Sequence, residues 1–172
     1  MIGTELETSG REFLEAILGL SPAQWTFKPA PERSVAEVAE QLLLSEDSLY
    51  FEVVNDIMRS PESPRHPPVR SMDRQALLSP QDRSAKATAP EYLTPGPAWS
   101  SPEALAAEFR KRRDRAITYV RAAGDELRKH FVSDPASGSL DACQCFLVLS
   151  GHTRRHVEQI LEIRRDPQFP RR

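Results

Sequence analysis

The chain is 172 residues long, which suits one domain with a single core, and its net charge of −2 gives no reason to expect a nucleic-acid partner. No apolar stretch approaches the roughly 20 residues that span a bilayer, so we expect no membrane partner. The N-terminal residues contain early acids and no apolar segment of the kind found in secretory signals, and we therefore expect a cytoplasmic location.

The first predicted helix runs roughly from Glu5 to Leu20, because apolar side chains recur there at helical spacing. Its apolar stripe consists of Leu6, Phe13, Leu14, Ile17 and Leu18. Pro22 ends the helix, since proline cannot continue the helical hydrogen bonds. Trp25 and Phe27 follow in a proline-punctuated loop, and we expect both to fold back onto the core.

The second predicted helix has a clear start at Ser34. Ser34 and Glu37 form the pattern S-x-x-E, a capping box that satisfies two backbone N–H groups at a helix N-terminus. The apolar side chains that follow extend the helical pattern to about Met58; they are Val35, Val38, Leu42, Leu49 and Val53.

A proline-rich connection follows, from Ser60 to Pro102. Nine of the fifteen prolines lie here, and proline removes hydrogen-bond donors, so we expect little regular structure apart from a brief helical turn at residues 72–79. Tyr92 and Trp99 suggest that parts of the connection pack against the core. Connections of this length are often functional.

Two further helices complete the predicted fold. The third starts at residues 100–103, where serine precedes proline, and extends to about Phe131; the fourth covers about Leu140 to Arg165. No segment shows the alternation of a strand. The sequence therefore predicts an all-α four-helix bundle that forms a single domain over residues 1–172, with the proline-rich connection (60–102) between its second and third helices.

We expect no functional site from the basic run or from the cysteines of these helices. We expect the basic run at residues 110–115 to be a solvated helix face. Cys143 and Cys145 point to different sides of a helix, so we expect reduced, half-buried thiols that form neither a disulfide nor a shared metal site.

His152 and His156 lie four residues apart on the fourth helix, so both imidazoles share one face. Such a pair supplies two converging metal ligands but needs a third from another helix; the alternative is a polar stripe without metal. Arg154 and Arg155 fall away from this face, and we expect them to be solvated. His66 and His130 are not expected to be ligands.

In its order of features the chain resembles the DinB-like superfamily of metal-binding four-helix bundles, which includes the hydrolase-like YfiT proteins and thiol-dependent transferases. The resemblance covers nearly the whole chain and is carried by residues 20–47, by the long connection, and by residues 151–164. The residues that fit the two family patterns are Ser34, Glu37, Leu42 and Glu46 in the first and Gly151, His152, His156, Gln159 and Ile160 in the second.

The family pattern has a third histidine where this chain has Gln41, and a tryptophan where it has Arg33. A neutral amide is a poor ligand for zinc or nickel. Two outcomes follow from the resemblance. In one, a divalent metal, zinc or nickel, binds His152 and His156 with Gln41 or water completing an open site. In the other, Gln41 hydrogen-bonds one imidazole and the site holds no metal.

The resemblance implies a metal-dependent enzyme, either a hydrolase or a thiol-dependent S-transferase or isomerase, that acts on a small-molecule substrate, with a low-molecular-weight thiol as a candidate partner. In this interpretation Glu46 is the candidate general base or orienting group. The resemblance also implies a homodimer. The alternative interpretation is a non-catalytic small-molecule-binding or stress-associated bundle that lacks bound metal, and the Gln41 substitution favours it.

Overall fold

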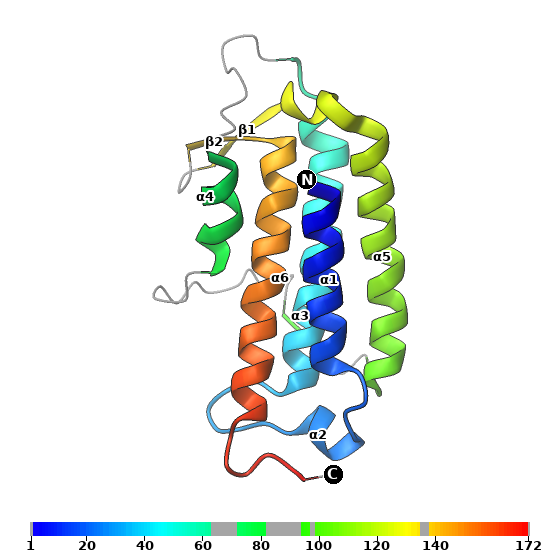
Figure 1. The fold of residues 1–172 in the computed structure, drawn as a ribbon, viewed down its shortest axis with the longest axis vertical. Coiled ribbons are helices and arrows are strands. Elements are labelled where there is room, and N and C mark those ends of the chain that lie inside the picture. The colour runs from blue at the N-terminus through cyan, green and yellow to red at the C-terminus, as the bar shows by residue number, and fades with distance from the viewer. Residues whose placement is uncertain (1, 63–71, 82–93, 97–98, 135–137, 172) are drawn as a thin grey trace.

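The computed structural model describes residues 2–62, 72–81, 94–96, 99–134 and 138–171. This part of the chain is mostly helical, as expected for an all-α protein. Four long helices run side by side along the longest axis of the molecule (Figure 1). They are α1 (Ile2–Ile17), α3 (Val35–Phe51), α5 (Pro102–Ala123) and α6 (Ala142–Arg164).

The four long helices form a closed set of interfaces. Both α6 and α5 pack against α1 and against α3, so each helix has two principal neighbours. The largest side chains buried between them are Phe13, Trp25, Leu42, Phe109, Phe146 and Ile160. Each such burial contributes roughly 1.5–3 kcal/mol relative to an exposed side chain, before entropy is counted. Most of the predicted apolar stripes are therefore core, although Leu18 lies beyond the end of α1 and is exposed.

The helix starts follow the predicted capping residues. Ser34 accepts a hydrogen bond from the Glu37 backbone N–H, and the Glu37 side chain accepts from the Ser34 N–H, which completes the capping box of α3. Ser101 caps α5 by accepting a hydrogen bond from the Ala104 backbone N–H, and Pro102 takes the first position of the helix. Both predicted starts are confirmed.

The predicted end of the third helix is wrong. Helix α5 stops at Ala123 because Gly124 adopts a φ of 53°, a left-handed conformation that glycine accepts without a side-chain clash. A 3₁₀ turn (Gly124–Arg128) follows. At the corresponding end of α3 the helix continues beyond Phe51 as a π-helical turn (Glu52–Ile57), close to the predicted limit.

A small hairpin precedes α6, whereas the sequence predicted no strand. Strand β1 (Phe131–Asp134) pairs antiparallel with β2 (Gly138–Asp141), with Phe131 opposite Asp141 and Val132 opposite Leu140. Strands of four residues are too short for alternation to be recognised in a sequence. Helix α6 consequently starts at Ala142, capped by Asp141, rather than at Leu140.

The loop after α1 contains a short helix, α2 (Pro22–Thr26), that the sequence did not predict. Ser21 and Gln24 form its capping box. Trp25 is fully buried and donates its indole N–H to the Trp99 carbonyl at 3.1 Å, so both predicted tryptophan contacts with the interior are confirmed. Phe27 packs edge-on against Phe169 at the margin of the core.

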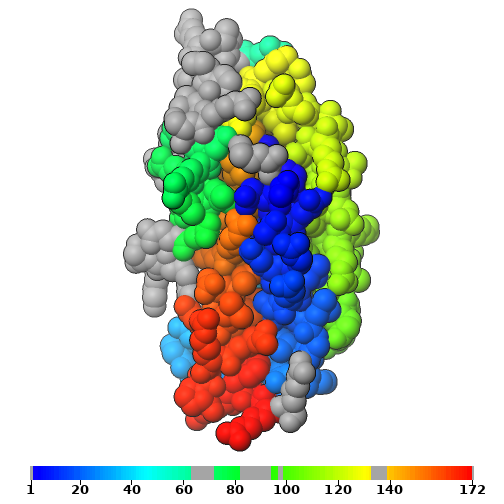
Figure 2. All heavy atoms as spheres, in the orientation of Figure 1, coloured from blue at the N-terminus to red at the C-terminus, as the bar shows by residue number. Residues whose placement is uncertain are grey.

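Part of the proline-rich connection is folded against α6. The predicted helical turn is helix α4 (Asp73–Leu78), followed by a 3₁₀ turn (Ser79–Gln81). Figure 2 shows α4 on the outer surface of the molecule beside α6. Arg128 holds the start of α4 through Asp73, at 2.6 and 2.8 Å, and also contacts Asp141 at 2.8 Å. His66 and Tyr92 lie outside the described residues.

The contact between α4 and α6 depends on a glycine. A Cβ atom at position 151 would come within 2.2 Å of the Leu77 carbonyl oxygen, so only glycine permits this approach.

Among the described helices, none combines the length and the apolar character that crossing a membrane requires.

Candidate functional site

The centre of the candidate site is the histidine pair on α6. The Nε2 atoms of His152 and His156 are 3.0 Å apart, and the two rings are nearly perpendicular, at 86°. His156 is buried, whereas His152 is partly exposed. The helical spacing thus brings the rings together as the sequence predicted, with both Nε2 atoms directed at one another.

Ser45 of α3 lies on the other side of the pair. Its hydroxyl is 3.3 Å from His152 Nε2 and donates to the Gln41 backbone carbonyl at 2.9 Å. Because the hydroxyl hydrogen is used on that carbonyl, Ser45 Oγ accepts from His152 Nε2–H. This assignment from the hydrogen-bond network makes His152 the donor of the pair and His156 Nε2 the acceptor.

The acceptor role of His156 places its proton on Nδ1. That atom is buried and has no hydrogen-bond partner within the described part of the chain, and the same is true of Oε1 of Gln159, one turn further along α6. Gln159 also acts on the His156 ring as a side-chain hydrogen-bond partner that raises its pKa, so Nδ1–H and Oε1 are complementary groups that fall just short of hydrogen-bond geometry here.

Both imidazoles are neutral at pH 7. Burial, with a smaller contribution from the positive charge of Arg155, lowers the pKa of His152 to about 4. The pKa of His156 is lowered well below its usual value, chiefly by burial and then by His152, with Arg155 and Arg33 contributing. The charged side chains that act most strongly on the pair are therefore cationic.

Gln41, the candidate third ligand, is engaged elsewhere. Its side chain is buried, with 8% of its surface exposed, and its Oε1 accepts a hydrogen bond from the Arg33 guanidinium. Within the described residues Gln41 makes no hydrogen bond to either imidazole. The amide oxygen that would complete a metal site thus faces a cation supplied by the loop before α3.

These donors fit a divalent metal ion poorly. In a tetrahedral zinc site, ligand distances of ~2.0–2.1 Å place two nitrogens about 3.3 Å apart, so the histidine pair alone is nearly suitable. The described residues, however, contain no cluster of three or more His, Cys, Asp or Glu side chains that could hold a metal ion. Arg33 adds positive charge beside the remaining candidate ligand.

Glu46 points into a different cluster, around Arg113 of α5. Arg113 donates from Nε to Glu46 Oε2 at 3.1 Å and from Nη2 to Glu46 Oε1. Both oxygens of the carboxylate are thus paired with a guanidinium in the interior, where Glu46 is 2% exposed. A carboxylate held in this way is a poor general base, and nothing in its contacts directs it at the histidines.

The remaining donors of Arg113 are also used. Nη1 donates to the Leu6 carbonyl at 2.7 Å and to Ser9 Oγ at 2.8 Å, and Nη2 donates to Thr153 Oγ1 at 2.8 Å. The prediction that residues 110–115 form a solvated face is wrong for Arg113, which is 3% exposed. The sequence of a basic run does not indicate which of its residues faces the core, because every position around the helix carries a charged side chain and no apolar residue marks the buried face.

The prediction that Arg154 and Arg155 are solvated is also wrong. Arg154 forms ion pairs with Glu5 at 3.0 Å and Glu12 at 2.9 Å on α1, and Arg155 donates to the Pro80 carbonyl. Long side chains reach partners on neighbouring elements even when their Cα atoms point away from the core. The two residues join α6 to α1 and to the segment after α4.

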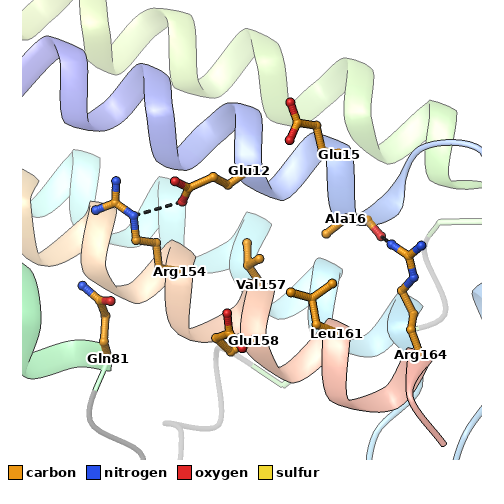
Figure 3. A pocket seen from close by; sticks show the side chains of 9 residues that line it. All are labelled: Glu12, Glu15, Ala16, Gln81, Arg154, Val157, Glu158, Leu161 and Arg164. Atoms are coloured by element: carbon orange, nitrogen blue, oxygen red, sulfur yellow. Dashed lines mark hydrogen bonds and ion pairs between the residues drawn. The ribbon is translucent and has the colours of Figure 1, made fainter.

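Arg154 also borders a surface groove of about 460 Å³ between α1 and α6. Figure 3 shows Arg154 reaching Glu12 near one end of this groove and Arg164 reaching the Ala16 carbonyl near the other. The α6 residues that line it are Arg154, Val157, Glu158, Leu161 and Arg164. Because Arg154 lies about 200° around the helix from both histidines, the groove is on the opposite side of α6 from the histidine pair.

Cys143 and Cys145 are buried, at 2% and 6% exposure, and so are more buried than expected, and no disulfide joins them in the described structure. His130 is half-buried in the turn before β1, with Nδ1 2.8 Å from the Ser60 carbonyl oxygen. Neither cysteine and neither ring nitrogen of His130 belongs to the histidine site in the described structure.

Sequence reasoning did not identify the contacts of Arg33 and Ser45 in the site. Ser45 carried a usable signal, since it follows Gln41 by four residues on the same helix. The sequence signal for Arg33 was only indirect. Arg33 directly precedes the capping box that starts α3, so its side chain lies close to the helix that carries Gln41.

The fold and site define a mostly helical protein with a paired-histidine site between two of its long helices. A family model described as the DinB superfamily matches residues 5–160, and the chain belongs to this superfamily. Searches of curated proteins and of solved structures found no significant match.

Proposed function

We propose that this DinB-superfamily protein is a single-domain four-helix bundle whose histidine site binds a small molecule without a resident metal ion. One observation carries the proposal: Oε1 of Gln41, the atom available as third ligand, accepts a hydrogen bond from the Arg33 guanidinium. A cation beside the open ligand position opposes a divalent ion by direct repulsion. The same cation favours ligands of opposite charge.

The state of the histidines supports this function. Both are neutral, and His152 Nε2–H is already a donor within the pair. His152 is partly exposed, whereas His156 and Gln41 are buried, so His152 is the member of the site nearest to solvent. Sites for small molecules typically combine a few such fixed polar groups with apolar surroundings.

A second candidate function is the metal-dependent hydrolase or thiol-dependent S-transferase that the superfamily suggests, with zinc or nickel as the ion. The 3.0 Å separation of the two Nε2 atoms favours it, because two ring nitrogens at this distance could share one metal ion if the proton of His152 moved to Nδ1. This function requires Gln41 to release Arg33, and Glu46 is not part of it because its carboxylate is paired with Arg113.

Metal analysis of protein purified without a polyhistidine tag separates the two functions. We expect wild type to contain substoichiometric metal, and we expect Gln41→His combined with Arg33→Gln to approach one ion per chain, because a third imidazole is added and a cation is removed. Stoichiometric metal in wild type that is lost in His152→Ala would contradict the metal-free proposal.

We also propose a cytoplasmic location and a homodimer. For the second candidate function we propose a low-molecular-weight thiol as co-substrate. Sedimentation of the purified chain checks the dimer. A competition assay with a thiol, read from the same untagged protein, checks the co-substrate.

A further inference from the structure

Helix α4 and the 3₁₀ turn after it lie on α6 outside the main hydrophobic core. The apolar side chains buried between the long helices form two clusters, and no side chain of residues 73–81 belongs to either cluster. Within this segment only Asp73 and Ala76 are buried, and Leu78 is 46% exposed. Helix α4 therefore lacks most of the apolar burial that stabilises the four long helices.

An arginine fixes the N-terminal end of α4. The Arg128 guanidinium, at the end of the 3₁₀ turn that follows α5, pairs with both carboxylate oxygens of Asp73 at 2.6 and 2.8 Å. Gln144 of α6 also donates to Asp73, at 3.2 Å. The side chains of Arg128 and Asp73 are only 11% and 10% exposed, so water competes weakly for this ion pair. A charged, two-pronged contact thus holds the start of α4.

The C-terminal end of the segment contacts α6 through two backbone carbonyls. The Leu77 carbonyl oxygen lies against Gly151, where no side chain is buried, and the Pro80 carbonyl accepts a hydrogen bond from Arg155 at 3.4 Å. A hydrogen bond of this length is weak. The segment is therefore held firmly at Asp73 and loosely at its other end.

The loosely held end lies beside the histidine pair. Gly151, Arg155 and His152 fall within about 100° of one another around α6, with Arg155 between the other two. The opposite flank of His152 faces α3, where Ser45 Oγ is 3.3 Å from its Nε2. His152 is consequently bordered by the segment after α4 on one side and by α3 on the other, and Figure 1 shows α4 lying along the outside of α6.

We propose that residues 73–81 form a lid that opens from α6 while the four-helix bundle stays folded, and that this opening controls access to His152. The ion pair between Arg128 and Asp73 is the lock of this lid. Segments with little apolar burial open locally at a lower free energy than the whole domain unfolds. The lid serves either candidate function, because it concerns the path to His152 and not the identity of the ligand.

Amide hydrogen exchange of the full chain, followed by NMR, measures the opening. We expect the hydrogen-bonded amides of α4 to exchange faster than those of α1 and α3 in wild type. Asp73→Asn weakens the lock with little change of shape, and it should speed exchange in α4 roughly 10- to 100-fold, the loss expected for a hydrogen bond to a charged group. Exchange in α1 and α3 should not change.

Reaction with diethyl pyrocarbonate, located by mass spectrometry, measures access to His152. The reagent modifies neutral imidazoles, and the rate at His152 should rise in Asp73→Asn together with exchange in α4. Gly151→Ala weakens the other end of the lid without changing any charge, because its Cβ would meet the Leu77 carbonyl, and it should raise both rates as well.

The matched control is Glu126→Gln, which breaks an exposed ion pair with Lys129 in the same turn that carries Arg128. It should leave both rates unchanged. Three results would each overturn the lid: unchanged exchange of α4 in Asp73→Asn, an equal rise of exchange in α1 and α3, or faster exchange of α4 with no faster modification of His152.

Discussion

Two polar clusters meet on adjacent residues of α6 and differ in how completely they are hydrogen-bonded. Thr153 contacts the Arg113 cluster, in which all five guanidinium donors have partners: two on Glu46, and one each on Leu6, Ser9 and Thr153. His152 belongs to the histidine cluster, where Nδ1 of the buried His156 has none among the described residues.

The difference separates a structural role from a binding role. A buried network that satisfies every member rigidifies the fold, because each group has lost its water and gained a fixed partner. A network with an open donor and a half-used cation keeps capacity for a ligand. On this comparison the Arg113 cluster joins α1, α3, α5 and α6, and the histidine cluster is the site at which the proposed function places a ligand.

The largest effect should come from breaking the Arg113 cluster. Arg113→Met leaves the Glu46 carboxylate buried and unpaired, and we expect a loss of about 3–5 kcal/mol in the free energy of unfolding. Combining it with Glu46→Leu removes the orphaned charge and should recover most of the loss. Urea unfolding at pH 7 measures both. Equal destabilisation in the single and double variants would show that the carboxylate is not the source of the penalty.

A smaller effect should follow from protonating the histidine cluster. The pKa of His152 is about 4 in the folded protein, below its unfolded value of ~6.5. The unfolded chain therefore binds a proton first as pH falls, and the contribution of this residue to stability, complete above pH ~6.5, is lost progressively down to pH ~4.

Between pH 7.5 and pH 5 this linkage amounts to about 2 kcal/mol, and the shift of His156 has the same sign. Urea unfolding at the two pH values should show wild type losing about that much more than His152→Gln, in which the titrating ring is absent while the carboxylates are unchanged. The same pH dependence in both proteins would contradict a neutral buried pair.

The smallest effect should come from Ser45→Ala. This change removes a hydroxyl that donates to the Gln41 carbonyl and accepts from His152, and we expect a loss of about 0.5–1.5 kcal/mol. The matched change in the other cluster, Thr153→Val, leaves a donor of a buried guanidinium unsatisfied and should cost more, about 1–3 kcal/mol. The reverse order, measured by urea unfolding, would contradict the assigned roles.

The sequence predicted the features that depend on near neighbours. The capping boxes at Ser34 and the serine start at Ser101 are set within three residues, and the meeting of His152 with His156 follows from the helical period alone. The burial of the two thiols and of Trp25 also follows from residue type, since burial of sulfur and indole groups is generally favourable.

Features that depend on distant contacts were not predicted. Gly124 could have continued a helix, but it adopts a positive φ and leads into a 3₁₀ turn before the hairpin. In the sequence Arg113 cannot be distinguished from its exposed neighbours. Its burial results from contacts with α1, α3 and α6 in the folded structure. The bond between Arg33 and Gln41 depends on the path of the loop before Ser34, which no periodicity describes.

The close approach at Gly151 makes this position epistatic with the proline-rich connection. The Leu77 carbonyl excludes any Cβ at residue 151 only while α4 (Asp73–Leu78) is docked, so the two segments must vary together although they are far apart in the chain. In a chain from which α4 is deleted, alanine or serine becomes acceptable beside His152. Any residue larger than glycine at 151 therefore requires the Leu77 segment to move away from α6.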